Sequence, residues 1–213
     1  MLKQYKLSEL DLLPSRFKAN LINSCTGYKS INIIGTKSDS GVENLAIFNS
    51  VIHLGSHPPL IGFTTRPLTV QRDTYDHIKA SGQFTINSVS AAFVDKAHQS
   101  AAKYPSDQSE FEKVGLTPEY LGNSLAPFVS ESALKYQCSY VNEYPIIENG
   151  CILIVGAIQE IYIAEDMISE DGWIDLSKRE ISTGIGLDGY AQPKDPIRFE
   201  YASPTTKPSL KNA

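Results

Sequence analysis

Short runs of apolar residues, separated by clusters of turn-forming residues, recur along the chain. Residues 30–36 are rich in isoleucine, and residues 83–87 alternate apolar and polar side chains. Both patterns are typical of β-strands. In total the chain predicts about six strands, at residues 30–36, 44–48, 60–64, 83–87, 134–140 and 151–163, with a last short strand or a turn at 173–176.

Helix signals lie between these strands. Residues 73–80 begin at Asp73, a preferred N-terminal cap, and end before Gly82, a preferred stop. Residues 92–102 place apolar side chains on one helical face. Two further helix starts are predicted, at 16–23 after Ser15 and at a capping box formed by Ser109 and Glu112.

The polar residues 53–57 are expected to form a loop, with Pro58 and Pro59 leading into the strand that follows. The first three strands follow one another too closely for crossover helices, so an antiparallel arrangement is expected. A small antiparallel barrel with helical excursions fits this order better than a doubly wound sheet.

The 213 residues are enough for one domain with a substantial core. We divide the chain into an N-terminal lead-in that packs on the barrel (1–28), the barrel domain itself (29–200) and a tail (201–213). The tail is rich in proline, serine, threonine and lysine, and we expect it to be flexible.

Charge and composition argue against several classes of partner. The chain has 19 basic and 24 acidic residues, a net charge of −5, and no long run of one sign. This balance argues against nucleic acid or an anionic membrane surface as the main partner. No apolar run reaches the roughly 18 residues that cross a bilayer, and the N-terminus lacks a signal-peptide pattern. Cys25, Cys138 and Cys151 form no CxxC pair, so we expect reduced thiols in a cytoplasmic protein.

Two apparent motifs fail on their context. Residues 184–189 read G-x-G-x-x-G, but a dinucleotide site needs a helix after this motif and none is predicted, so a glycine-rich turn is expected. His53 and His57 have the spacing of two metal ligands on a helix, but Gly55 and the following prolines argue against a helix there. No cysteine or carboxylate cluster completes a metal site, and we expect none.

A candidate anion site lies at Arg72, Asp73 and Thr74. A helix N-terminus offers unpaired N–H groups and a partial positive charge, which bind phosphate. Arg72 would add a bidentate donor and Thr74 a hydroxyl. Asn49 and Ser50, directly after an apolar run, could bond a heterocycle or a phosphate. On spacing alone, an ordinary helix cap and an ordinary turn explain these residues at least as well.

An ordered series of residues between 29 and 190 adds to this picture. It comprises Thr36, Gly41, Asn44-Leu45-Ala46, Asn49-Ser50, Pro58-Pro59-Leu60-Ile61, Arg66-Pro67, Arg72-Asp73-Thr74, Ile78, Gly82, Phe84, Asn87, Lys96-Ala97-His98, Ser109-Glu110-Phe111, Gly115-Leu116, Ala126-Pro127, Gly184-Ile185-Gly186 and Tyr190. The series resembles the flavin reductase-like, FMN-binding split-barrel family, above all its longer, flavoredoxin-like members.

The resemblance implies a mainly β fold, a six-stranded antiparallel Greek-key split barrel with short inserted helices. It also implies a homodimer with FMN near the subunit interface. In this family the flavin carries the redox chemistry, so no side chain need act as general acid or base. Hydride would pass from NADH or NADPH to N5 of the flavin.

The resemblance also distributes the contacts to FMN along the chain. The flavin ring would meet Asn49, Ser50 and the backbone of Val51, with Ser56 nearby. The ribityl phosphate would be bound around Arg72, Asp73 and Thr74. Further candidates are Asn87, Lys96 and His98.

One departure from the family keeps the function open. Many short-chain flavin reductases carry Gly-Asp-His before the late apolar strand, linked to nicotinamide binding, whereas residues 147–151 here read Ile-Glu-Asn-Gly-Cys. Three functions remain. The protein is an NAD(P)H-dependent flavin reductase, an FMN-binding electron carrier that serves a redox protein partner, or a non-catalytic barrel that binds another ligand.

Overall fold

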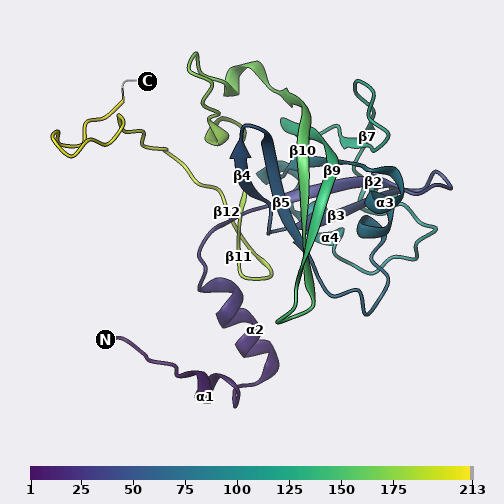
Figure 1. The fold of residues 1–213 in the computed structure, drawn as a ribbon, viewed down its shortest axis with the longest axis horizontal. Helices are drawn as coiled ribbons and strands as arrows, with labels where there is room; N and C mark the ends of the chain where they lie inside the picture. The colour runs from purple at the N-terminus through teal and green to yellow at the C-terminus, as the bar shows by residue number, and fades with distance from the viewer. Residues whose placement is uncertain (212–213) are drawn as a thin grey trace.

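The computed structural model describes residues 1–211 and is built around one seven-stranded antiparallel sheet (Figure 1). The strands are ordered β3–β2–β6–β9–β10–β5–β4, and all neighbours are antiparallel. Their bounds are β2 Asn32–Lys37, β3 Glu43–Phe48, β4 Ile52–Ser56, β5 Pro59–Thr65, β6 Gln83–Ser88, β9 Leu134–Ile146 and β10 Cys151–Ile163. The predicted fold class, mainly β and antiparallel with short inserted helices, is confirmed, with seven strands in this sheet instead of six.

The seventh strand is β4, at the place where we predicted a polar loop. That prediction is wrong: Ile52 pairs with Gly62 and Ser56 with Pro59, and the register shifts between His53 and Gly55. The strand lies at the edge of the sheet, and its apolar side chain Ile52 is 51% exposed. Because an exposed edge strand has no buried face, it lacks the hydrophobic alternation that marks a strand in the sequence.

In the described part of the chain, five α-helices connect or precede the strands. They are α1 Leu7–Leu10, α2 Ser15–Ser24, α3 Asp73–Ser81, α4 Val94–Gln99 and α5 Glu110–Val114, with single 3₁₀ turns η1 Ala91–Phe93, η2 Glu165–Met167 and η3 Leu176–Arg179. Helix α3 ends at Gly82, which adopts the left-handed conformation with φ of 70°. The helix predicted at 92–102 is shorter than expected, because a 3₁₀ turn replaces its first part and α4 ends at Gln99.

Two predicted caps are wrong in detail. Arg72, not Asp73, is the N-cap of α3, and the Asp73 carboxylate accepts a bond from the Gln71 side chain at 2.8 Å. Ser109 is the N-cap of α5, but its side chain makes no capping bond. Glu110 instead ties this helix start to strand β3 by accepting the backbone N–H of Leu45 at 3.0 Å. At the start of α3, no side chain of the described residues 1–211 makes a capping bond.

Two small sheets complete the fold. β1 Lys29–Ser30, β11 Thr183–Ile185 and β12 Gly189–Ala191 form one, and β7 Pro118–Glu119 with β8 Phe128–Val129 form the other. The G-x-G-x-x-G stretch is the β11–β12 hairpin, as its sequence context predicted, and Gly186 in its turn has φ of 64°. Residues 173–176 contribute one bridge, Ile168 to Ile174.

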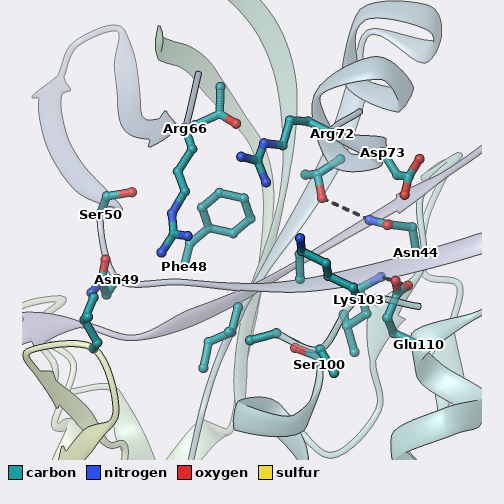
Figure 2. A pocket seen from close by; sticks show the side chains of 18 of the residues that line it. Asn44, Phe48, Asn49, Ser50, Arg66, Arg72, Asp73, Ser100, Lys103 and Glu110 are labelled. Carbon is teal, nitrogen blue, oxygen red and sulfur yellow. Dashed lines mark hydrogen bonds between the residues drawn. The ribbon is translucent and has the colours of Figure 1, made fainter. Parts of the chain in front are cut away.

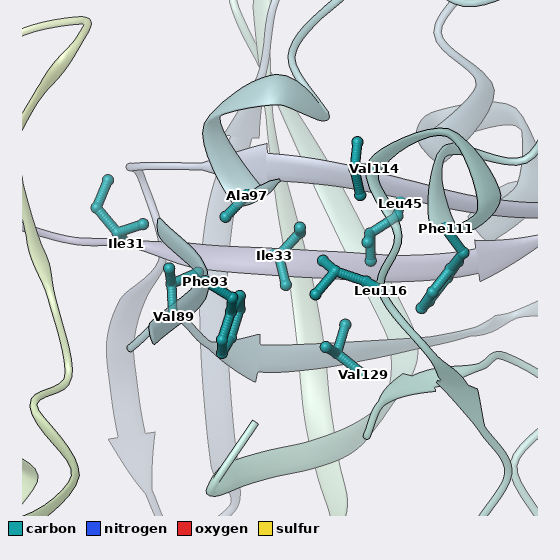
Figure 3. Packing of buried hydrophobic residues seen from close by; sticks show 10 residues of the cluster. All are labelled: Ile31, Ile33, Leu45, Val89, Phe93, Ala97, Phe111, Val114, Leu116 and Val129. Carbon is teal, nitrogen blue, oxygen red and sulfur yellow. The ribbon is translucent and has the colours of Figure 1, made fainter. Parts of the chain in front are cut away.

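Two apolar clusters lie on opposite sides of β2. Because neighbouring side chains of a strand point to opposite faces, Ile33 packs in one cluster and Ile34 in the other. The first cluster lies under α4 and α5 and contains Ile31, Ile33, Leu45, Val89, Phe93, Ala97, Phe111, Val114, Leu116 and Val129 (Figure 3). The second contains Phe63, Phe84 and Ile78 of α3. A strand buried on both faces explains the unbroken isoleucine-rich run in the sequence.

The two ends of the chain extend away from the barrel (Figure 1). Helices α1 and α2 contain no fully buried residue. The C-terminal segment is held at Asp171, whose carboxylate pairs with Arg198 at 2.6 Å and with Lys211 at 2.5 Å. The last two residues of the predicted tail, 212–213, lie outside the described part. None of the helices within residues 1–211 has both the length and the apolar character needed to cross a bilayer.

Candidate functional site

A cleft of about 780 Å³ opens where the ends of β3 and β5, the start of α3, the loop after α4 and the β11–β12 hairpin meet. Its lining includes Asn44, Phe48, Asn49, Ser50, Thr64, Arg66, Arg72, Asp73, Thr74, Ser100, Lys103, Glu110, Cys151, Gly186 and Tyr190. Figure 2 shows Asn49, Ser50 and Arg66 at one end and Asn44, Asp73 and Glu110 at the other. The cleft is therefore elongated and polar at both ends.

Three cationic side chains, Arg66, Arg72 and Lys103, point into the same open space (Figure 2). Within residues 1–211 none of them lies in an ion pair with a carboxylate. Arg72 Nε is buried and has no hydrogen-bond partner there. A buried polar atom without a partner destabilises the folded state, so Arg72 Nε is suited to donate a hydrogen bond to an acceptor group of a ligand.

The start of α3 adds neutral donors beside Arg72. Thr74 is 8% exposed and lines the cleft, and its Oγ1 accepts a bond from Asn44 Nδ2 at 3.1 Å. Among residues 1–211 no side chain caps this helix, and Arg72, Asp73 and Thr74 at its start line the cleft, so its first N–H groups are free to bond a ligand there. Unpaired N–H groups with a positive helix end and an arginine form a phosphate-binding arrangement.

Two carboxylates share this end of the cleft. Glu110 is partly buried, and burial raises its pKa, against the lowering effect of the Leu45 N–H that it accepts. The nearby Asp73 carboxylate raises the pKa of Glu110 further. Glu110 in its charged form repels an anion, so its protonation state bears on what the cleft binds.

The opposite end of the cleft is less charged. Ser50 is tied to Thr64 by two bonds, accepting its N–H at 3.1 Å and donating to its carbonyl at 3.3 Å. Asn49 Nδ2 donates to the carbonyl of Gly186 at 3.2 Å, which joins β3 to the β11–β12 hairpin. Phe48, whose ring is drawn in Figure 2, and Tyr190 also line the cleft. Flat apolar surfaces and amide groups suit a planar heterocycle.

The structure brings five of the ten predicted site residues into this cleft: Asn49, Ser50, Arg72, Asp73 and Thr74. His98 lies one side chain away, with its Nδ1 2.8 Å from the hydroxyl oxygen of Tyr190. Lys96 donates to the carbonyl of Gly115 at 2.7 Å, outside the lining. Val51 is buried, and Ser56 lies on the edge strand beside His53.

Asn87 is buried inside the barrel and does not line the cleft. Its side chain is fully buried, donates to the carbonyl of Ile33 and to Thr85, and accepts the N–H of Val129 at 2.9 Å. These bonds use its polar atoms inside the barrel, away from the cleft lining.

Several lining residues were not among the predicted site residues. Arg66 follows β5 and could have been found from its place in the same stretch as Arg72. Lys103 lies in an irregular loop after α4, and no local pattern marks it. Asn44 and Glu110 belong to the residue series that carries the family resemblance, and both have polar side chains next to buried positions.

Comparison with known proteins decides the family. The flavin reductase like domain matches residues 28–179, which is most of the chain. The chain belongs to this family. Its resemblance to flavin reductases and flavoredoxins of split-barrel fold, read first from the sequence, is confirmed.

Solved structures of other proteins share the fold over 83% to 94% of this chain. A split-barrel protein of flavin reductase type from Shewanella frigidimarina NCIMB 400 is 40% identical, with a TM-score of 0.91 and coverage of 94% of this chain and 100% of that one. Flavoredoxin of Desulfovibrio vulgaris (Miyazaki F) is 21% identical, with a TM-score of 0.70 over 84% and 92% of the two chains. An FMN-binding protein from Thermus thermophilus is 16% identical, with a TM-score of 0.66 over 83% and 90%. The two more distant structures establish the split-barrel fold alone.

Proposed function

We propose that the protein binds FMN in this cleft and acts as an NAD(P)H-dependent flavin reductase. The observation that carries the proposal is a set of three cations beside the start of α3. Within residues 1–211 these cations have no ion-pair partner, Arg72 Nε has no hydrogen-bond partner, and no side chain caps the helix. A net charge of −5 makes such a local cluster of cations unusual for this chain. The name of the FMN-binding relative from Thermus thermophilus agrees with the proposal.

In this proposal each end of the cleft has its own task. Arg72, Lys103, Thr74 and the N–H groups of α3 hold the phosphate, whereas Asn49 and the backbone around Ser50 meet the ring. When bound, FMN supplies the redox chemistry. The protein's residues orient the ring and offer donors toward the side of it that becomes negative on reduction.

The decisive experiment uses the purified protein reconstituted with FMN. A yellow protein whose flavin absorbance bleaches under anaerobic addition of NADH or NADPH supports the flavin reductase. A colourless protein that cannot be loaded with FMN contradicts both flavin functions and leaves a barrel for another ligand.

A second function is an FMN-binding electron carrier that receives its electrons from a protein partner. It is favoured by residues 147–151, which lack the histidine of the Gly-Asp-His motif. In that case the yellow protein would bleach with dithionite but with neither nicotinamide.

We also propose that the protein is a homodimer, as the family resemblance implies. Helix α2 supports this proposal because none of its residues is fully buried, although Phe17 and Ile22 are apolar. Light scattering of the FMN-loaded protein tests it, and a mass of one chain would contradict it.

A further inference from the structure

A series of hydrogen bonds connects Thr74 in the cleft to His77, about one helical turn further along α3. Asn44 Nδ2 donates to Thr74 Oγ1 at 3.1 Å and to Thr36 Oγ1 at 2.9 Å. Thr36 Oγ1 in turn lies 3.2 Å from His77 Nδ1. Thr36 is fully buried, and Asn44 and Thr74 are 6% and 8% exposed. The bond between Asn44 and α3 is the dashed line in Figure 2.

The donor and the acceptor in each of these hydrogen bonds follow from the number of hydrogens on each group. An amide nitrogen carries two hydrogens, and Asn44 gives one to each threonine. Burial lowers the pKa of His77, against the raising effects of Asp73, Asp76 and Asp39, so the neutral ring can accept the hydrogen of Thr36.

The hydrogen bond from Asn44 determines whether the Thr74 hydroxyl acts as donor or acceptor toward a ligand. Its Oγ1 already accepts from Asn44, and among residues 1–211 no hydrogen bond takes up its own hydrogen. A hydroxyl has one hydrogen to donate, so Thr74 can donate it to an acceptor group of a ligand in the cleft. If the Asn44 side chain instead presented an acceptor to Thr74, the hydroxyl would turn a lone pair toward the cleft and repel a phosphate.

We propose that Asn44 is a positioning residue, which orients the Thr74 hydroxyl so that it donates to the anionic group bound at the start of α3. The inference rests on the proposed FMN function, since the phosphate is the anion concerned. Asn44 acts through Thr74 and needs no contact with the ligand itself. Groups held in place before binding lose less entropy when the ligand arrives.

The test is a double-mutant cycle read as the ratio of the affinities for FMN and riboflavin, measured by flavin fluorescence on the apoprotein. Riboflavin lacks the phosphate, so the ratio of the two affinities removes any effect of a substitution on binding of the flavin ring. We expect Asn44→Ala to lower the ratio about tenfold, the value of one hydrogen bond to a charged group. In a Thr74→Val background, the same change should alter the ratio less than about twofold, because the hydroxyl through which Asn44 acts is absent. Asn123→Ala, at an exposed asparagine, is the matched control.

Two results would overturn the inference: an unchanged ratio in Asn44→Ala, or the same loss with and without the Thr74 hydroxyl. If the alanine variant does not fold by circular dichroism, Asn44→Leu retains the shape and takes its place. Loss of folding in both variants would assign Asn44 to stability alone and would also overturn the inference. A wild-type protein that does not prefer FMN to riboflavin instead contradicts the proposed function, so the two failures are distinguishable.

Discussion

The Nδ1 atom of His98 lies 2.8 Å from the hydroxyl oxygen of Tyr190, and the two rings meet edge to face with centroids 5.7 Å apart. His98 comes from α4 and Tyr190 from β12, so this pair fastens the hairpin that forms one wall of the cleft. Tyr190 lines the cleft at the end that we propose for the flavin ring.

We expect Tyr190→Ala to weaken FMN and riboflavin by the same factor, about tenfold, because the lost contact is aromatic surface and not phosphate. Tyr190→Phe keeps the ring and should change either affinity less than about threefold. Fluorescence titration with both ligands measures the effect. A loss confined to FMN would place Tyr190 at the phosphate end.

Removing the guanidinium of Arg72 tests the phosphate end directly. Arg72→Ala should weaken FMN by about 1.5–3 kcal/mol and leave riboflavin nearly unchanged, because the contact is charge-assisted and specific to phosphate. Isothermal titration with the two ligands measures it, and Arg179→Ala, an exposed arginine paired with Asp166, is the control. Equal losses for both ligands would contradict the assignment of Arg72.

Glu110→Gln removes a charge but keeps an acceptor for the Leu45 N–H. Burial raises the pKa of Glu110 above its ordinary value of 4.5, so the folded state binds more protons than the unfolded state above that pH. The stability that wild-type Glu110 contributes is therefore fully present below pH 4.5 and is lost as pH rises through the folded pKa. We expect the glutamine variant to gain in Tm relative to wild type as pH rises from 4 to 7.

The same substitution should tighten FMN at neutral pH, because it removes a negative charge from the cleft. Glu112→Gln, on the exposed side of α5, is the matched control for both measurements. A Tm difference that is constant with pH would show that Glu110 has the same pKa folded and unfolded.

Phe63 lies at the centre of a cluster of three aromatic rings inside the barrel. It is fully buried, and its ring meets those of Phe48 at 5.2 Å and Phe84 at 5.6 Å, both edge to face. We expect Phe63→Ala to lower the free energy of unfolding by about 3–5 kcal/mol in urea denaturation. Phe199→Ala, at a ring that is 57% exposed, should change it by less than about 0.5 kcal/mol. A similar small loss at Phe63 would mean that the barrel interior collapses to fill the space.

The local part of the fold could be predicted from the sequence, because β2, β6 and β10 bury apolar side chains and α3 ends at a glycine. The edge strand β4 could not, since its side chains face solvent and its pairing depends on β5. Arg72 and Thr74 follow from the chemistry of a helix start. Lys103 joins them only through the tertiary fold, which brings an irregular loop over the cleft.

The β11–β12 hairpin has a consequence for biosynthesis. Gly186, Gly189 and Tyr190 complete a cleft whose other wall begins at Asn44, and the hairpin pairs with β1 at Lys29. During translation, residues near position 190 leave the ribosome well after the α3 helix start has been made. A chain that has been made only as far as β10 therefore lacks part of the cleft lining, and the cleft is complete only after the β11–β12 hairpin has been made.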